Sequence, residues 1–277
     1  MHTMLKSIFA MHKIELVGAV PMSKCKVIRP YKLISAGFDD KQDLSVIVFA
    51  IPYYTKNGKS NISAYASSRD YHLFATQLFD AILPQMREIF PQYRFVGFAD
   101  NSPIAEVHTA ALAGLGVIGD NMMLITDKYS SYVFLGEIIT DAPIDIKDDY
   151  TISTCEHCGK CKTACPMEKI GVCLSALTQK KGELSDDERS AIVKYGYAWG
   201  CDICQEACPH TQNAIKQGTI YTPIEFFKQD VTPYLTSDGV RSMTDEQFAS
   251  RAYSWRGRNT IVRNLEILEK SEAKEEQ

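Results

Sequence analysis

The sequence lacks the features that would direct or anchor a chain in a membrane. No apolar run reaches transmembrane length, and the N-terminal stretch MHTMLKSIFAMHKIELVGAV is interrupted by His12, Lys13 and Glu15 too early for a signal peptide. The net charge is −4, so no overall basic field favours nucleic-acid binding. These absences predict a soluble, cytoplasmic protein with no membrane partner.

Two nucleotide-binding motifs are missing as well. No G-x-G-x-x-G follows a predicted strand, and the sequence holds no P-loop, so neither dinucleotide nor nucleotide binding is indicated. With 277 residues, 45% of them hydrophobic, the chain can bury the core of one large domain or two modest ones.

Cysteine, by contrast, is concentrated in one region. Eight of the nine cysteines lie between positions 155 and 208, and the first four form C-x2-C-x2-C-x3-C-P, a ferredoxin spacing in which the fourth thiolate ligates the other cluster of a pair. We therefore predict two 4Fe–4S clusters. One is assigned to Cys155, Cys158, Cys161 and Cys208, and the other to Cys165, Cys173, Cys201 and Cys204.

Three other interpretations of these cysteines were weighed. Disulfides need an oxidising compartment, and the sequence carries no signal that would direct the chain to one. Structural zinc uses four ligands in paired C-x2-C units and would leave the third and fourth cysteines unexplained. Inert buried thiols do not fall into such a spacing. Cys173 is the least regular ligand of the eight, and Cys25 stands apart as an ordinary thiol.

The first 150 residues are predicted to mix helices and strands. Residues 44–51, 94–99 and 132–139 are typical of strands. Residues 69–90 show apolar side chains spaced by four, which predicts a helix that Pro84 kinks. A further helical run, 106–116, ends at glycines. Residues 151–215 are predicted to form the cluster module, in which Ser185 begins a capping box, and 216–277 a helical segment with a disordered tail over its last eight residues.

Outside the cysteines, the most unusual segment is 99–121, ADNSPIAEVHTAALAGLGVIGDN. Asp100 and Asn101 directly follow a predicted strand, and three glycines punctuate an apolar loop, as where backbone passes close to a large ligand. A strand end, a turn and a helix C-cap without any ligand would give the same pattern.

A set of motifs in sequence order resembles the epoxyqueuosine reductase family, cobalamin-dependent iron–sulfur enzymes of tRNA queuosine synthesis, and more distantly the reductive dehalogenases. The matching pieces span roughly residues 25–265. They are RDYH, DNSPIAE, AGLGVIGDN, SYVFLGEIITD, CEHCGKCKTACP, CLSALTQKKGEL and YGYAWGCDICQEACP, with SWRGRNTIVRN at the margin.

The resemblance implies an α+β architecture and a reaction. A nitroreductase-like α/β domain (1–150) would hold cobalamin without a protein ligand to cobalt. A ferredoxin-like module with two 4Fe–4S clusters (151–215) and a short helical C-terminal segment (216–277) would follow. Asp100 would supply the proton to the opened epoxide of the modified tRNA base, and Tyr71 and His72 would line the substrate side. The implied cobalamin contacts are Arg29, Ile62, Asp100, Leu124, Leu135 and Ser175. Reduced flavodoxin or ferredoxin would supply the electrons.

The sequence departs from the family pattern at several points. Val117 and Asp120 stand where the family has Trp and Lys, and Val107 where it has Arg, which leaves room for a changed substrate. Many members also carry a C-terminal helical-repeat domain that helps bind tRNA, and the sequence given does not include it. Four arginines at 251, 256, 258 and 263 could form a basic stripe for phosphates, although such arginines are more often ion-paired on a helix face.

Three hypotheses about function follow. The first is reduction of epoxyqueuosine in tRNA to queuosine. The second is a shorter relative that keeps both cofactor types and reduces another small substrate or a corrinoid partner. The third is a ferredoxin-type electron carrier without a catalytic centre.

Overall fold

The protein is described by a computed structural model over residues 2–38, 43–55, 58–144 and 150–275. The chain forms two compact units that interleave along the sequence, where three consecutive segments were predicted. The first unit comprises Met1–Tyr53, His72–Gly159 and His210–Ile224, and the second Tyr54–Tyr71, Lys160–Pro209 and Glu225–Gln277.

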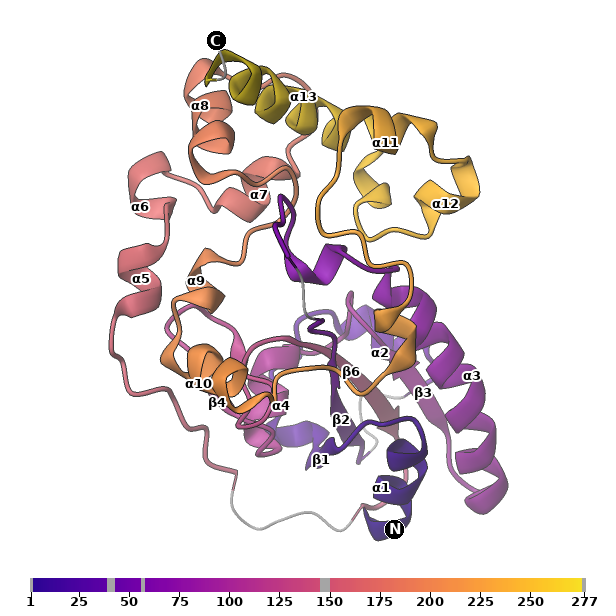
Figure 1. Cartoon of the computed structure of the whole chain (residues 1–277). Coiled ribbons are helices and arrows are strands. Elements are labelled where there is room, and N and C mark those ends of the chain that lie inside the picture. The colour runs from indigo at the N-terminus through magenta and orange to yellow at the C-terminus, as the bar shows by residue number, and fades with distance from the viewer. Residues whose placement is uncertain (1, 39–42, 56–57, 145–149, 276–277) are drawn as a thin grey trace. The chain divides into compact units, whose positions relative to one another are not determined.

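The first unit is built on a four-stranded antiparallel sheet with strand order β1-β2-β6-β3 (Figure 1). A separate two-stranded ribbon pairs β4 with β5. The strands are β1 Leu16–Pro21, β2 Ser45–Pro52, β3 Phe95–Phe98, β4 Val117–Ile118, β5 Leu124–Ile125 and β6 Val133–Thr140. The helices are α1 His2–Met11, α2 Pro30–Ser35, α3 Tyr71–Ile89, α4 Glu106–Leu112 and α10 Pro209–Gln217.

Helices cover both faces of this sheet. On one face, Phe49 of β2 packs against Phe9 of α1 and Phe79 of α3, with ring centroids 4.7 and 6.2 Å apart. On the other face, Val48 of β2 lies in a buried apolar cluster with Ala110 of α4. Because side chains alternate along a strand, β2 and β6 are buried on both sides, which explains the nearly uninterrupted apolar run of residues 44–51.

The predicted strands and helices of the first 150 residues are confirmed to within a few residues. β2, β3 and β6 correspond to the strands predicted at 44–51, 94–99 and 132–139. The helix predicted at 69–90 corresponds to α3, which continues through Pro84. The helix predicted over 106–116 ends at Leu112, and Gly114 follows with a φ of 75°, a left-handed conformation that suits glycine.

The second unit is helical and surrounds the cysteines from position 161 onward. Its helices are α5 Lys160–Ala164, α6 Met167–Ile170, α7 Leu174–Thr178, α8 Asp186–Tyr195, α9 Ile203–Glu206, α11 Ser237–Ser242, α12 Asp245–Ala249 and α13 Arg258–Glu275. The capping box at Ser185 is confirmed, because its side chain accepts from the Glu188 amide while the Glu188 carboxyl accepts from the Ser185 amide.

The tail predicted as disordered is helical in large part. α13 runs to Glu275, so the prediction of disorder over the last eight residues is wrong for most of them. Glu, Lys and Ala, which fill this stretch, are good helix formers and extend a helix that its earlier turns anchor. The buried residues of α13 include Ile261 and Leu265, which pack into the apolar core of the second unit with Trp199.

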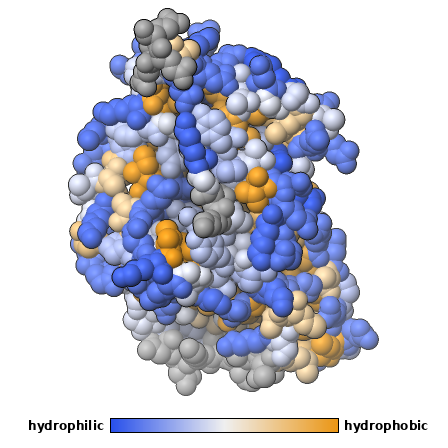
Figure 2. All heavy atoms as spheres, in the orientation of Figure 1, coloured by the Kyte–Doolittle hydropathy of each residue, from blue (hydrophilic) through white to orange (hydrophobic). Residues whose placement is uncertain are grey.

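No helix within the described part of the chain is long and apolar enough to cross a membrane. The face drawn in Figure 2 is mainly hydrophilic, with hydrophobic residues in small separate groups.

Candidate functional site

The loop after β3 holds Asp100 in a conformation that only a firm framework maintains. Asp100 and Asn101 have φ values of 55° and 39°, the left-handed region that costs non-glycine residues roughly 1–3 kcal/mol each. The next residue, Ser102, is fully buried, and its hydroxyl accepts a hydrogen bond from the Ile104 amide at 3.2 Å. The Asp100 side chain itself is 66% exposed. Strained backbone of this kind clusters at functional sites, and here it presents a carboxyl outward.

Arg29 ties a second segment to this loop. Its guanidinium donates to the Ser102 carbonyl at 2.8 Å, and its backbone amide donates to the Pro103 carbonyl at 3.0 Å. The chain around Arg29 exposes four large apolar side chains. They are Val27, Ile28, Tyr31 and Ile34. An apolar strip beside a strained, carboxyl-bearing loop is a suitable surface for a large flat ligand.

His72 is the basic neighbour of Asp100. Its Nε2 lies 3.8 Å from the Asp100 Oδ2, and its side chain is 51% exposed. His72 is held in the first turn of α3, directly after Tyr71. The histidine of the RDYH motif and the aspartate of the DNSPIAE motif, 28 positions apart in the sequence, therefore meet in one site.

Two buried glutamates belong to the same loop and sheet. Glu137, in the middle of β6, is 0% exposed, and Glu106 opens α4. Burial raises the pKa of Glu106 to about 7, with the charge of Asp100 adding to the rise. Burial also raises the pKa of Glu137 well above its ordinary value, reinforced by the charges of Glu106 and Asp100. Burial in this environment therefore shifts both carboxyls toward the protonated form near neutrality.

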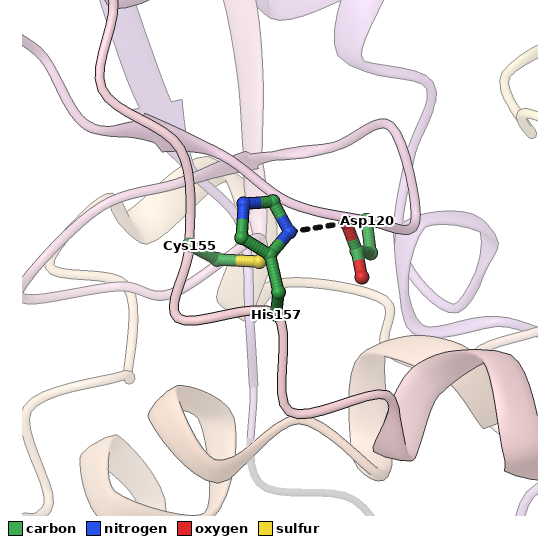
Figure 3. Close-up of side chains that lie close together, drawn as sticks. All are labelled: Asp120, Cys155 and His157. Atoms are coloured by element: carbon green, nitrogen blue, oxygen red, sulfur yellow. Dashed lines mark hydrogen bonds and ion pairs between the residues drawn. The ribbon is translucent and has the colours of Figure 1, made fainter.

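The loop that carries Cys155 is fixed to the β4 ribbon. The Cys155 amide donates to the Ile118 carbonyl at 3.1 Å. His157, with a φ of 53°, lies with its Nδ1 2.8 Å from the Asp120 Oδ1. One ligand atom each from Asp120, Cys155 and His157 lie within 4.8 Å of one another (Figure 3). Asp120, one of the departures from the family pattern, thus engages the segment between two predicted cluster ligands.

The four cysteines predicted for one cluster, Cys165, Cys173, Cys201 and Cys204, all belong to the second unit. α5 packs against α9, and the thiols of Cys165 and Cys173 act electrostatically on Cys204, while Cys204 and Cys173 act on Cys201. Burial raises the pKa of Cys201 to about 12 and that of Cys204 to about 11. Four thiols at this proximity fit an iron–sulfur cluster, which takes thiolate ligands and releases their protons on binding.

A hydrogen-bond network fixes the loop that carries Cys201. The buried Asp202 accepts from the Ser63 hydroxyl at 2.5 Å and from the Ala64 amide at 2.6 Å. On the other side, the Asn264 amide group donates to the Ala198 carbonyl at 2.8 Å. These contacts fix the backbone around the Cys201 thiol without a bound metal.

The other predicted quartet is divided between the units. Cys155 and Cys158 belong to the first unit, and Cys161 and Cys208 to the second. The residues predicted to contact cobalamin are divided in the same way. Arg29, Asp100, Leu124 and Leu135 belong to the first unit, and Ile62 and Ser175 to the second. Within the first unit, Leu124 and Leu135 lie in one apolar cluster.

No protein-family model matches the chain. A curated epoxyqueuosine reductase from Gloeobacter violaceus is 32% identical over 217 residues, which cover 74% of this chain and 68% of the relative. The chain belongs to the epoxyqueuosine reductase family. A second member, from Listeria monocytogenes, is 30% identical over 82% of the chain and 64% of its own length, so the chain spans about two thirds of these oxidoreductases.

Solved structures of epoxyqueuosine reductases share the fold. One contains an epoxyqueuosine-modified tRNA-Tyr stem loop, and it matches with a TM-score of 0.72 and 22% identity over 96% of this chain and 81% of its own. Another, from Bacillus subtilis, has an aspartate-bearing catalytic loop swung out of its active site, and it matches with the same score, identity and coverage. The mixed α/β architecture predicted from the sequence is confirmed at this level.

Two functional candidates in this family member escaped the sequence interpretation. Glu137 lies within the apolar strand SYVFLGEIITD, and Asp202 lies between two cysteines. A glutamate inside an apolar strand is a sequence signal for a candidate functional residue, because glutamate is almost never fully buried unless it is paired. Nothing in the sequence tells which residue it faces.

The proposed arginine stripe is largely occupied by structural contacts. Arg251 donates to the Asp230 carbonyl, Arg258 to the Val240 carbonyl and Arg263 to the carbonyls of Gly182 and Lys180. Arg256 stacks over the Trp255 ring at 3.8 Å from its centroid. These guanidiniums tie segments of the second unit together, chiefly through backbone carbonyls, a structural role that differs from both the phosphate stripe and the ion-paired helix face.

Proposed function

We propose that this chain reduces epoxyqueuosine in tRNA to queuosine in the cytoplasm, using two 4Fe–4S clusters and cobalamin. The observation that carries the proposal is the Asp100 loop, which combines a strained backbone, an outward carboxyl, a neighbouring histidine and an adjoining apolar strip. Family membership supplies the reaction class, and the relatives with an aspartate-bearing catalytic loop and a bound tRNA stem loop point to the same assignment.

The residues present suit both cofactors. The thiol quartet of the second unit matches the ligand set of a 4Fe–4S cluster, and the apolar strip around Arg29 suits the flat face of a corrin. In this proposal the first domain is nitroreductase-like and the cysteine module ferredoxin-like. When bound, the cofactors supply electrons one at a time from reduced flavodoxin or ferredoxin to the epoxide.

Asp100 acts on the oxygen of the substrate. Opening the epoxide leaves an alkoxide, which needs an acid within hydrogen-bond reach. The left-handed backbone at Asp100 and Asn101 aims the carboxyl away from the sheet, where a substrate above the apolar strip would meet it. His72, 3.8 Å from the carboxyl, holds it in position. Covering the site with substrate removes water and strengthens this interaction.

The pairing of Asp120 bears on the choice of substrate. The acid that replaces the family's lysine is engaged by His157 in the cysteine loop. The charge of Asp120 is thereby paired within that loop. The substitution is therefore weaker evidence for a different substrate than the sequence alone suggested. A pure electron carrier would have no use for the strained Asp100 loop and its carboxyl.

The test begins with anaerobic purification and reconstitution of the clusters in the presence of cobalamin. Absorption and EPR spectra should show bound corrinoid together with about eight irons per chain. The reconstituted protein should then reduce an epoxyqueuosine-containing anticodon stem loop. Clusters without bound corrinoid would overturn the proposal and leave an electron carrier, whereas bound corrinoid without turnover of the stem loop would indicate a different substrate.

The Asp100→Asn variant isolates the acid. Asparagine tolerates the left-handed conformation, so the loop should keep its shape. We expect corrinoid and iron contents like those of wild type and a turnover lower by roughly 100-fold or more, within the range that a positioned acid contributes. Asp127→Asn, an exposed change in the same unit, is the matched control. Wild-type turnover in Asp100→Asn would remove the aspartate from the mechanism.

A further inference from the structure

The carboxyls of Glu106 and Glu137 face each other beneath the Asp100 loop. Glu137 lies on β6 opposite Phe98 of β3, the strand that runs into Asp100, and α4 packs over β6 with Glu106 in its first turn. The carboxyl of Glu106 lies within hydrogen-bonding reach of both the Glu137 side chain and the Asp100 backbone amide. Glu137, Glu106 and Asp100 therefore form a series of acids that leads from the sheet to the exposed carboxyl of Asp100.

The two buried carboxyls have no other described partner that would hold them as anions. Neither oxygen of Glu137 accepts a hydrogen bond from any described group, and one oxygen of Glu106 is likewise buried and unpaired. Glu137 is flanked on β2 by Val48, an apolar neighbour. Two charges side by side in such surroundings would be strongly unfavourable, and a single proton shared between them removes the conflict.

The ionisable groups around the pair favour a state in which the two carboxyls share a single proton. Arg29 lowers the pKa of Glu106, and Asp100 opposes it. The buried thiol of Cys25 feels the charge of Glu137, and burial raises the pKa of this thiol to about 11, so it stays neutral. His72 faces Asp100 from α3, and the buried Nδ1 of His108 on α4 has no described hydrogen-bond partner. Once Asp100 has given its own proton to the substrate, its carboxylate opposes Arg29 beside Glu106, and the pair holds a proton that this carboxylate can accept.

The proposed reaction needs more protons than Asp100 carries. Converting an epoxide to an alkene breaks both carbon–oxygen bonds, forms a carbon–carbon double bond and releases the oxygen as water. This consumes two electrons, supplied by reduced flavodoxin or ferredoxin, and two protons. Asp100 gives one proton. Once substrate covers the loop, water cannot readily bring the second.

We propose that Glu106 and Glu137 form a buried proton store that recharges Asp100 within a single turnover. The inference rests on the proposed function and deepens it. The shared proton leaves the pair, passes to the Asp100 carboxylate and from there reaches the departing oxygen as water forms. After product release, solvent returns two protons: one passes through the exposed Asp100 to the pair, and the other stays on Asp100. Glu137 acts through Asp100 and is a positioning residue.

Infrared spectroscopy tests the store without any turnover. A protonated carboxyl has a carbonyl-stretch band apart from those of carboxylates, and the band shifts in heavy water. We expect this band in the cluster- and corrinoid-loaded wild-type chain at neutral pH and a weaker band in Glu137→Gln, because burial alone keeps Glu106 only partly protonated near neutrality. The exposed Glu88→Gln on α3 is the matched control and should keep the wild-type band. A wild-type spectrum without the band overturns the proposal.

Single-turnover kinetics test delivery to Asp100. Glutamine keeps the shape of Glu137 and can still donate to Glu106 but has no proton to give. We expect Glu137→Gln to reduce the stem loop roughly 100-fold more slowly, with unchanged affinity. An unchanged rate contradicts the store.

Failure of the proposed function gives a different result. A wild-type protein that shows the infrared band, weakened in Glu137→Gln, but does not reduce the stem loop refutes the substrate and with it the delivery step. The Glu106→Gln variant guards against misfolding as an explanation, because burial should keep Glu137 protonated and preserve a band while the circular dichroism stays like that of wild type.

Discussion

The imidazole of His157 contacts the carboxyl of Asp120, with 2.8 Å between Nδ1 and Oδ1, in the loop that separates Cys155 from Cys158. The other ring nitrogen lies 3.0 Å from the Thr154 hydroxyl. The side chain of Asp120 is only 15% exposed, so its charge acts on the loop with little screening by solvent.

Asp120→Asn should therefore change the reduction potential of the cluster proposed at Cys155. Removing a negative charge stabilises the more negative, reduced form of a cluster, so the potential should become more positive. We expect a shift on the order of tens of millivolts, since 59 mV corresponds to a tenfold change for a one-electron couple. An EPR-monitored redox titration measures it, with Asp127→Asn as the control. Equal potentials in both variants would mean that this charge does not reach the cluster.

Cys173→Ser tests the least regular predicted ligand. Cys173 lies near enough to Cys201 and Cys204 to act on them electrostatically, which is consistent with the predicted quartet. We expect iron to fall from about eight to about four per chain as one cluster is lost. Cys25→Ser, which changes a thiol of the first unit, should keep the full content. Full iron in Cys173→Ser would exclude this residue as a required ligand.

The buried carboxyl pair predicts a stability that falls as pH rises. Glu106 has a folded-state pKa of about 7 against an ordinary 4.5, and that of Glu137 is also raised. The folded protein therefore holds protons that the unfolded chain has released over this interval, and the free energy of unfolding decreases through it by up to about 3 kcal/mol. Urea denaturation at about pH 5 and about pH 8 measures the difference. Glu106→Gln should remove the part of this decrease that Glu106 contributes, and an unchanged slope in that variant would contradict the assignment.

Arg263→Ala should lower stability and leave RNA affinity unchanged. Arg263 donates to the Lys180 carbonyl at 2.9 Å and to the Gly182 carbonyl, joining α13 to the loop before α8. Hydrogen bonds to a charged group stabilise by roughly 1.5–3 kcal/mol, so we expect a loss of about 2 kcal/mol in urea denaturation. Arg241→Ala, which breaks an exposed ion pair with Glu266, should have a much smaller effect on stability. A stable Arg263→Ala variant with weakened stem-loop binding would restore the phosphate role.

The sequence by itself determined those features that depend on local spacing. The three strands 44–51, 94–99 and 132–139 follow from apolar runs, and the capping box at Ser185 follows from two residues three positions apart. The cysteine spacing predicted ligand sets, because cluster geometry restricts how closely thiolates are spaced along a chain. Asp100 emerged through the family motif around it.

The tertiary structure decided what depends on contacts between distant segments. Glu106 and Glu137 meet because antiparallel pairing sets Glu137 opposite Phe98 and α4 folds back over β6, which no local pattern encodes. The sequence alone left a phosphate-binding stripe open for the arginines of 251–263. In the structure, three of them donate hydrogen bonds to backbone carbonyls elsewhere in the second unit. Local propensities are set by neighbours within a few residues, whereas burial, partners and protonation are set by whatever the fold brings alongside.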